Sequence, residues 1–224
     1  MIDQSHELIR WTDGTEKKIY DISVPLSSET PVFPGRPRFD KKLILSLARG
    51  EGANISELAL TSHTGTHVDS PNHFIQDMDT IDKIPFRRVI GGARVFELNV
   101  AEKIDGPDIQ SLAIEPGSIV LFKTRNSTLW AEKEFRKDYV YLTKGAAEVL
   151  RDRGVTAVGF DYVIPDELEN MARPVHHVLF GKEIILIEGL NLRNVPPGDY
   201  FFICLPLSIK DGEAAPARAV LVEV

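Results

Sequence analysis

The chain has 224 residues, of which 43% are hydrophobic, and its formal net charge is −7. This size and apolar content are typical of a globular protein with a full hydrophobic core, and we expect one domain over residues 1–224. The acidic balance, without any run of lysine and arginine, argues against a nucleic-acid partner.

The N-terminal segment, residues 1–18, reads MIDQSHELIRWTDGTEKK and mixes charges of both signs. It lacks the apolar run of a signal peptide, and we expect it to form an N-terminal arm with His6 on its surface. No apolar stretch in the sequence approaches the length that spans a membrane. We therefore expect a cytoplasmic protein without a membrane partner.

Apolar runs predict strands, in chain order, at residues 55–62, 95–100, 119–123, 139–142, 155–160, 183–187, 200–205 and 219–222. Helices are expected at 108–113, at 146–153 and at 176–180. Thr143 and Gly154 are typical cap residues for the second helix, so strands 139–142 and 155–160 predict a parallel, right-handed crossover. Because strands outnumber helices, the fold class is predicted as mixed α/β, with a mixed sheet or partly closed barrel and a few helices outside it.

Residues 63–73, HTGTHVDSPNH, hold three of the six histidines. A helix fits poorly, because Gly65 and Pro71 would disrupt it. In an extended chain, four odd-numbered polar residues tend toward one side: His63, His67, Asp69 and His73. A straight strand would separate His63 from His67 by roughly 13 Å, too far for bonds near 2 Å to one ion. We expect the segment to bend at Gly65 and Pro71 and to bind a metal.

A second polar group surrounds the predicted strand that ends at Glu188. Its carboxylate needs a partner or a shifted pKa if it is buried, and a cation would serve as partner; otherwise Glu188 points into water. His176 and His177 precede this strand, and only one of two adjacent histidines is expected to face a common site. Asp161 and Asp166 are predicted as loop residues rather than as partners of histidine ligands.

Two other residues are predicted to be structural. Cys204 lies in the apolar run YFFICLPL and is expected to pack as a small hydrophobe. Arg218 flanks the last strand and could pair with a buried carboxylate or with substrate, but an arginine at such a position is commonly structural. Because Cys204 has no activating neighbour in sequence and no GxSxG pattern occurs, a protein nucleophile is disfavoured.

These residues resemble the metal-dependent cyclase/hydrolase family that contains the bacterial kynurenine formamidases and the isatin hydrolases. The family signature H-x-G-T-H-x-D-x-P-x-H is matched at every fixed position by residues 63–73. The likeness continues through TPVFPG at 30–35, VGFD at 158–161 and the block around Glu188. It implies a compact mixed β-barrel with peripheral helices, a homo-oligomer, and zinc or manganese as cofactor.

The resemblance also implies roles for individual residues. His63, His67 and Asp69 would bind a first metal, and Asp69 would bridge to a second metal held by His176 and Glu188. His73 would be the general acid/base, and the role of His177 stays open.

The substrate implied by the resemblance is a small amide. A metal with an open coordination position activates water near neutral pH, and His73 can move the proton. We expect hydrolysis of N-formyl-L-kynurenine to L-kynurenine and formate, as in tryptophan catabolism. The family places Trp where this chain has Phe33, a position against which the substrate packs. The alternatives are opening of a cyclic amide such as isatin, or a non-catalytic metal-binding protein, for which a closed site would not need His73.

Overall fold

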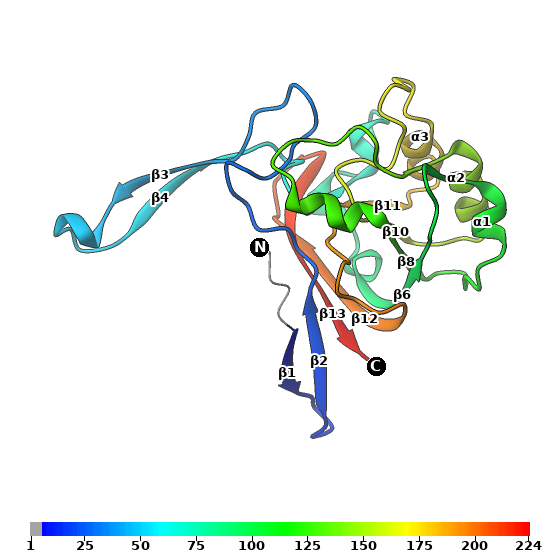
Figure 1. The fold of residues 1–224 in the computed structure, drawn as a ribbon, viewed down its shortest axis with the longest axis horizontal. Helices are drawn as coiled ribbons and strands as arrows, with labels where there is room; N and C mark the ends of the chain where they lie inside the picture. The colour runs from blue at the N-terminus through cyan, green and yellow to red at the C-terminus, as the bar shows by residue number, and fades with distance from the viewer. Residues whose placement is uncertain (1–5) are drawn as a thin grey trace.

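The computed structural model describes residues 6–224. Within that part of the chain, seven strands close into a β-barrel in the order β13-β12-β6-β8-β10-β11-β5, and β5 pairs with β13 to complete the ring. Neighbours from β6 to β11 are parallel, and the other pairs are antiparallel (Figure 1). The strands of the ring are β5 His67–Asp69, β6 Ile90–Glu97, β8 Ile119–Lys123, β10 Ala157–Phe160, β11 Ile185–Glu188, β12 Gly198–Pro206 and β13 Ala214–Glu223. The predicted mixed barrel is confirmed.

Three helices pack together on one side of the barrel, on the right in Figure 1: α1 Gly106–Gln110, α2 Lys144–Asp152 and α3 Pro174–Phe180. The predicted cap of α2 is present, since the Thr143 hydroxyl accepts a hydrogen bond from the Ala146 amide. Short 3-10 helices connect other elements, at Leu47–Arg49, Pro71–His73, Ile81–Lys83, Phe86–Arg88 and Arg125–Ala131. No helix within residues 6–224 is long and apolar enough to cross a membrane.

The crossover predicted from residues 139–160 is wrong in its first strand. Only Tyr141–Leu142 is extended (β9), and it pairs in parallel with β7, Lys103–Ile104, outside the barrel. Both edges of β10 are already occupied, by β8 and β11. Helix α2 therefore belongs to a longer connection from β8 to its parallel neighbour β10.

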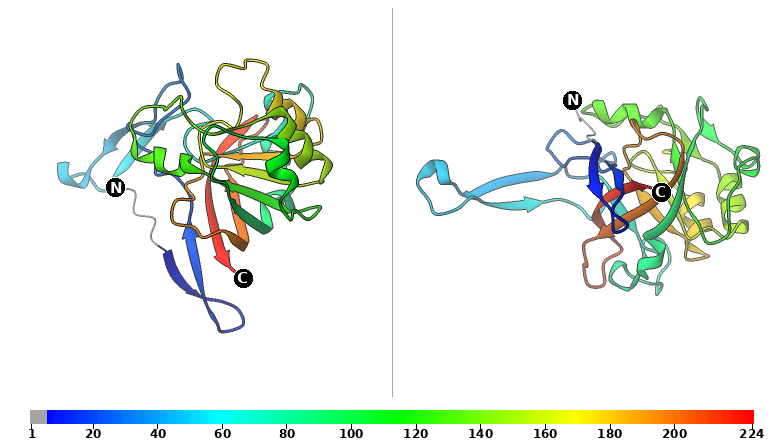
Figure 2. Two further views of the ribbon diagram at one scale, coloured as in Figure 1. Left: turned by 45° about the vertical axis from the view of Figure 1, so that its right-hand side comes forward. Right: turned by 90° about the horizontal axis from the view of Figure 1, so that it is seen from below.

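Two hairpins extend from the barrel. The predicted N-terminal arm includes the antiparallel pair of β1 His6–Arg10 and β2 Glu16–Asp21, and β2 adds to the barrel by pairing with β13. The strand predicted at 55–62 is β4, Ile55–Ala59, which pairs with β3, Asp40–Leu45. This second hairpin projects far from the barrel in every view (Figures 1 and 2). It carries exposed apolar side chains, including Leu43, Ile55 and Leu58.

Side chains along the central strands alternate between two apolar cores. On β8, Ile119 and Leu121 belong to one buried cluster together with Val68, which comes from β5 across the barrel. Val120 and Phe122 belong to the other cluster, which includes the side chains of the three helices. Burial on both faces explains why these strands are continuous apolar runs in the sequence. It also means that a polar side chain on the helix-covered face needs a partner there.

Candidate metal centre

Strand β5 places its two polar residues on one face. Val68 points into the barrel core, and because side chains alternate along a strand, His67 and Asp69 point to the opposite face. His67 lies directly opposite Glu188 of β11 in the antiparallel register. His67, Asp69 and Glu188 are all at most 3% exposed. Of the two alternatives left open for Glu188, the structure shows burial at the end of its strand rather than exposure to water.

Two glycines bring β5 close to the end of β11. Gly65 has φ of +69°, as the predicted bend requires, and Gly189 has φ of +73°. A Cβ atom on Gly189 would lie 2.2 Å from the Gly65 carbonyl oxygen, so only glycine permits this approach. Thr66 stabilises this close contact between the two segments, because its hydroxyl donates to the Gly189 carbonyl at 2.6 Å.

The same turn sets the orientation of His67. Its Nδ1 lies 2.9 Å from the Gly65 carbonyl oxygen, to which an Nδ1–H can donate. Nε2 is thereby directed at the carboxylates of Asp69 and Glu188, each 3.3 Å away. In this tautomer Nε2 keeps its lone pair for a metal.

His63 and His73 join the cluster from turns on either side of β5. The Nδ1 atom of His63 lies 2.9 Å from an Asp69 oxygen. Pro71 begins a 3-10 helix that ends at His73, as the predicted second bend requires, and the His63 and His73 rings are 4.2 Å apart. His67 and Asp69 thus share a side because side chains alternate along a strand, as predicted, whereas His63 and His73 reach the site through turns.

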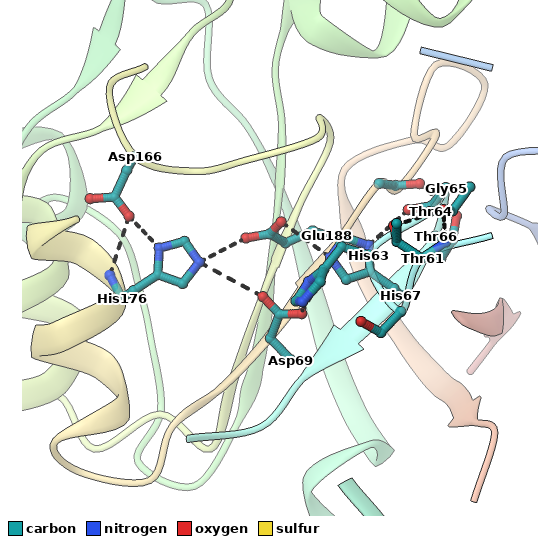
Figure 3. A network of polar contacts seen from close by, with 12 residues as sticks. Thr61, His63, Thr64, Gly65, Thr66, His67, Asp69, Asp166, His176 and Glu188 are labelled. Carbon is teal, nitrogen blue, oxygen red and sulfur yellow. Dashed lines mark hydrogen bonds and ion pairs between the residues drawn. The ribbon is translucent and has the colours of Figure 1, made fainter. Parts of the chain in front are cut away.

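The sixth member, His176, comes from α3. Its Nε2 lies 3.2 Å from Glu188 and 3.7 Å from Asp69 (Figure 3). Its Nδ1 contacts the buried carboxylate of Asp166, which also accepts a hydrogen bond from the Val175 amide at 2.8 Å. The prediction of Asp166 as a plain loop residue is therefore wrong, since this carboxylate orients a histidine of the cluster. Spacing alone could not decide between these two roles, because Asp166 and His176 are ten residues apart.

Several polar atoms in the cluster are buried without a hydrogen-bond partner: His67 Nε2, both carboxylate oxygens of Asp69, and Glu188 Oε1. Buried polar atoms are costly unless they are satisfied. His67, Asp69 and Glu188 offer ligand atoms within 4.8 Å of one another, and His63, Asp69 and His73 form a second such group. Imidazole and carboxylate are suitable ligands for zinc and manganese, so the unsatisfied atoms fit a metal cofactor.

Electrostatics within the cluster shift several pKa values. Burial opposes protonation of His67, but the carboxylates of Asp69 and Glu188 outweigh it and raise its pKa to about 10. Burial similarly opposes protonation of His176, and its bonds to Asp166 and Asp69 raise the pKa well above the ordinary value. Burial would raise the pKa of Asp69, but the His63 and His67 charges hold it well below its usual range.

The pKa of His73 is shifted in the direction opposite to those of His67 and His176. Burial lowers its pKa to about 4, against the opposing effect of Asp69. Its ring is therefore neutral near pH 7, with a lone pair that can accept a proton.

A cavity of about 500 Å³ opens onto this cluster, and His63, Asp69, His73, His176 and Glu188 line it. Phe33 lines the same cavity. The polar cluster forms one part of the wall, and apolar side chains such as Val32 and Ile164 form another. The cavity thus offers both reactive groups and an apolar surface.

Other predicted residues lie outside the cluster. His177 is exposed, and its ring is 5.5 Å from Phe74. Asp161 is buried and bonds Thr124 and Ser127, while burial raises its pKa to about 6. Cys204 is buried in the barrel core and Arg218 pairs with Asp21, so both are structural as predicted.

Among the charged residues that line the cavity, Glu213 and Arg173 were not predicted as site residues from the sequence. Glu213 lies 3.4 Å from His63 and accepts a hydrogen bond from Ser62. Arg173, just before α3, is 6% exposed. Neither stands in a motif, and both reach the cavity only because distant segments fold together.

Comparison with known proteins agrees with this geometry. The family model described as Putative cyclase matches residues 20–167. A kynurenine formamidase of Salinibacter ruber is 37% identical over 205 residues, which cover 91% of this chain and 96% of the relative. A solved structure described as a potential metal-dependent hydrolase with cyclase activity has a TM-score of 0.83 and 33% identity, covering 93% of this chain and 98% of that one. Isatin hydrolase A from Labrenzia aggregata, at 23% identity, shares the fold with a TM-score of 0.81, over 92% of this chain and 94% of its own.

A closed mixed barrel with imidazoles and carboxylates gathered at a cavity defines a metal-dependent hydrolase, and the predicted enzyme class is confirmed. The chain belongs to the cyclase family, as the motif at residues 63–73 predicted.

Proposed function

We propose that the protein is an arylformamidase, which hydrolyses N-formyl-L-kynurenine to L-kynurenine and formate. The observation that carries the proposal is the cluster of unsatisfied ligand atoms beside a neutral histidine, on the wall of a cavity that also presents Phe33. The kynurenine formamidase of Salinibacter ruber supports the choice of substrate, since its similarity extends over most of both chains.

The proposed ligands are the residues that the sequence motif indicated. His63, His67 and Asp69 would hold one ion, and Asp69 would bridge to a second ion held by His176 and Glu188. Zinc and manganese both suit these nitrogen and oxygen ligands. When bound, the metal supplies a Lewis acid that polarises the amide carbonyl and lowers the pKa of water.

His73 is the proposed general acid/base. Its neutral ring can take a proton from the attacking water and return it to the amide nitrogen as the C–N bond breaks. Burial is the main cause of its lowered pKa, so a proton that His73 accepts is readily passed on to the leaving group.

Phe33 is the proposed platform for the aromatic ring of the substrate. It lines the cavity, and its own ring is held edge-on by Phe135 with the centroids 6.2 Å apart. Phe offers less area than the Trp expected in kynurenine formamidases and lacks the indole N–H. We therefore expect weaker aromatic packing here, compensated by other contacts with the substrate.

The alternatives make different use of the site. Isatin-type ring opening would use the same ligands, but the solved isatin hydrolase resembles this chain in fold alone. A non-catalytic metal protein would have no use for the large cavity that opens onto His73.

The test is the initial rate of formylkynurenine hydrolysis by protein loaded with zinc or manganese, with isatin in parallel and a chelated control. Metal-dependent loss of formylkynurenine, faster than that of isatin, is the expected result. No turnover of formylkynurenine at full metal occupancy would refute the proposal.

We also propose a homo-oligomer. The projecting hairpin of β3 and β4 exposes Leu43, Ile55 and Leu58, each more than 40% accessible, which a second copy of the chain would cover. Exchange of all three for Asn should shift the size measured by light scattering toward that of one chain, and an unchanged size would contradict this. The single domain and the cytoplasmic location stay predictions from the sequence.

A further inference from the structure

Arg173 is a buried cation in the cavity wall, 6% exposed. Within the part of the chain that the structure describes, no carboxylate lies within ion-pair distance of it. Burying a charged group without a counter-charge costs free energy. A residue in this position therefore suggests that an anion arrives from outside the protein.

The guanidinium of Arg173 is fixed in place from three sides. Its Nη1 donates to the carbonyls of Glu167 at 2.8 Å and Leu168 at 3.1 Å. Its Cζ lies 5.4 Å from the centre of the Phe33 ring. Nη2 contacts only the Met171 sulfur, at 3.8 Å, which is a weak acceptor. A guanidinium has five N–H donors, so this one retains donors for a ligand.

The backbone conformation of Arg173 also indicates a functional role. Its φ of 44° and ψ of 55° place it in the left-handed region, which is unfavourable for a side chain of this size. Such strain persists where surrounding structure enforces it, and it is concentrated at functional sites. Here the strained residue begins α3, three positions before His176, so its position is coupled to that of the metal cluster.

The acids of the cavity are engaged elsewhere. Asp69 and Glu188 face the histidines of the cluster, and Glu213 accepts a hydrogen bond from Ser62 at 2.5 Å. Arg36 adds a second cation to the lining, and its exposed side chain has no hydrogen bond or ion pair within the described residues. In a chain of net charge −7, this cavity therefore presents two cations that have no carboxylate partner among the described residues.

We propose that Arg173 determines specificity by binding an anionic group of the substrate, with Arg36 assisting at the exposed side. The substrate class is an aromatic formamide that carries a carboxylate, with the ring against Phe33 and the amide at the metal cluster. Neutral amides such as isatin cannot make this contact. This inference rests on the proposed function, because it assigns the remote end of the same substrate.

The experiment compares two substrates of nearly equal shape: N-formyl-L-kynurenine and its primary carboxamide, which lacks the negative charge. The metal-loaded protein should prefer the acid by about 10- to 100-fold in kcat/KM, the range expected for a hydrogen bond to a charged group, chiefly through KM. In Arg173→Gln that preference should disappear, because kcat/KM should fall far more for the acid than for the carboxamide. Arg173→Lys should recover part of it.

Arg38→Gln is the matched control, because Arg38 lies two residues after Arg36 but pairs with Glu134 and does not line the cavity. Its substrate preference should equal that of the unaltered protein. An equal fall of kcat/KM on both substrates in Arg173→Gln would indicate a structural role and overturn the proposal. A preference for the acid that survives the substitution would also overturn it. Should Arg173→Gln fail to fold, an unaltered protein that does not distinguish acid from carboxamide overturns it equally.

Failure of the proposed function is recognised separately. If the metal-loaded protein hydrolyses neither formamide, the arylformamidase proposal falls, and binding decides the role of Arg173. Calorimetry with L-kynurenine and its carboxamide should then show tighter binding of the acid, by about tenfold or more, and loss of that difference in Arg173→Gln. Equal binding of the two compounds would overturn the assignment.

Discussion

Replacing Asp166 with Asn tests how the histidine of α3 is held. Asp166 is fully buried, and its carboxylate accepts from the amides of Val175 and His176 and contacts the His176 ring. An Asn side chain has only one oxygen that can accept from these donors. Its NH2 group would face the donors that the second carboxylate oxygen now accepts from. The imidazole then loses the charged partner that orients it and makes it a better ligand.

The magnitude follows from that contact. Removing a carboxylate that supports a histidine ligand costs about 10- to 100-fold in metal affinity, equivalent to roughly 1.4 to 2.7 kcal/mol. Competition by protons should change as well, because Asp166 is a principal cause of the raised His176 pKa. The variant should therefore bind zinc more weakly, with a shallower dependence on pH.

Zinc affinity measured by competition with a chromophoric chelator, between pH 6 and pH 9, is the appropriate assay. Asp161→Asn is the control, since Asp161 is equally buried but bonds Thr124 and Ser127 instead. It should lower thermal stability and leave zinc affinity unchanged. An Asp166→Asn protein with unaltered zinc affinity, or an equal loss in Asp161→Asn, would refute the reasoning.

Three further outcomes are expected. His73→Asn should retain metal, measured by elemental analysis, and lower kcat by about 10²- to 10⁴-fold; loss of metal would make His73 a ligand instead. Because the pKa of His67 is raised to about 10, the metal-free site holds a proton that zinc must displace. Zinc affinity should therefore rise with pH from 6 to 9, and calorimetry in buffers of different ionisation enthalpy should detect proton release; binding without release would contradict this protonation state. Gly189→Ala should lower stability by about 2 to 5 kcal/mol in denaturant unfolding, from left-handed strain and the clash with Gly65. Gly92→Ala, where a Cβ meets nothing within 4 Å, should change it little, and equal effects would contradict the close-approach argument.

The proposed ligands were accessible to sequence reasoning because most of them lie in one short motif. Residues 63–73 contain three histidines and an aspartate, and the bends at Gly65 and Pro71 follow from elementary backbone geometry. Glu188 was accessible for a different reason, since a carboxylate that ends a buried apolar strand needs a partner.

The errors arose where distant segments decide the structure. The role of Asp166 depends on the position of α3, which brings His176 to its carboxylate. The role of Arg173 depends on the folded cavity wall, in which no carboxylate of the described residues pairs with it. Similarly, the strand at Tyr141–Leu142 pairs outside the barrel because other strands occupy both edges of β10. A local pattern defines a strand, but it does not identify the partner.

The short strand β5 has a consequence for the order of folding. It leaves the ribosome early, yet both strands that pair with it, β11 and β13, begin more than 100 residues later in the chain. The ring cannot close until those long loops have formed, and closing them carries an entropic cost that slows folding. The contact between His67 and Glu188 consequently cannot form until most of the chain has been synthesised. The complete cluster, with His176 and Glu188 added to the residues of the motif, therefore forms only after most of the chain has been made.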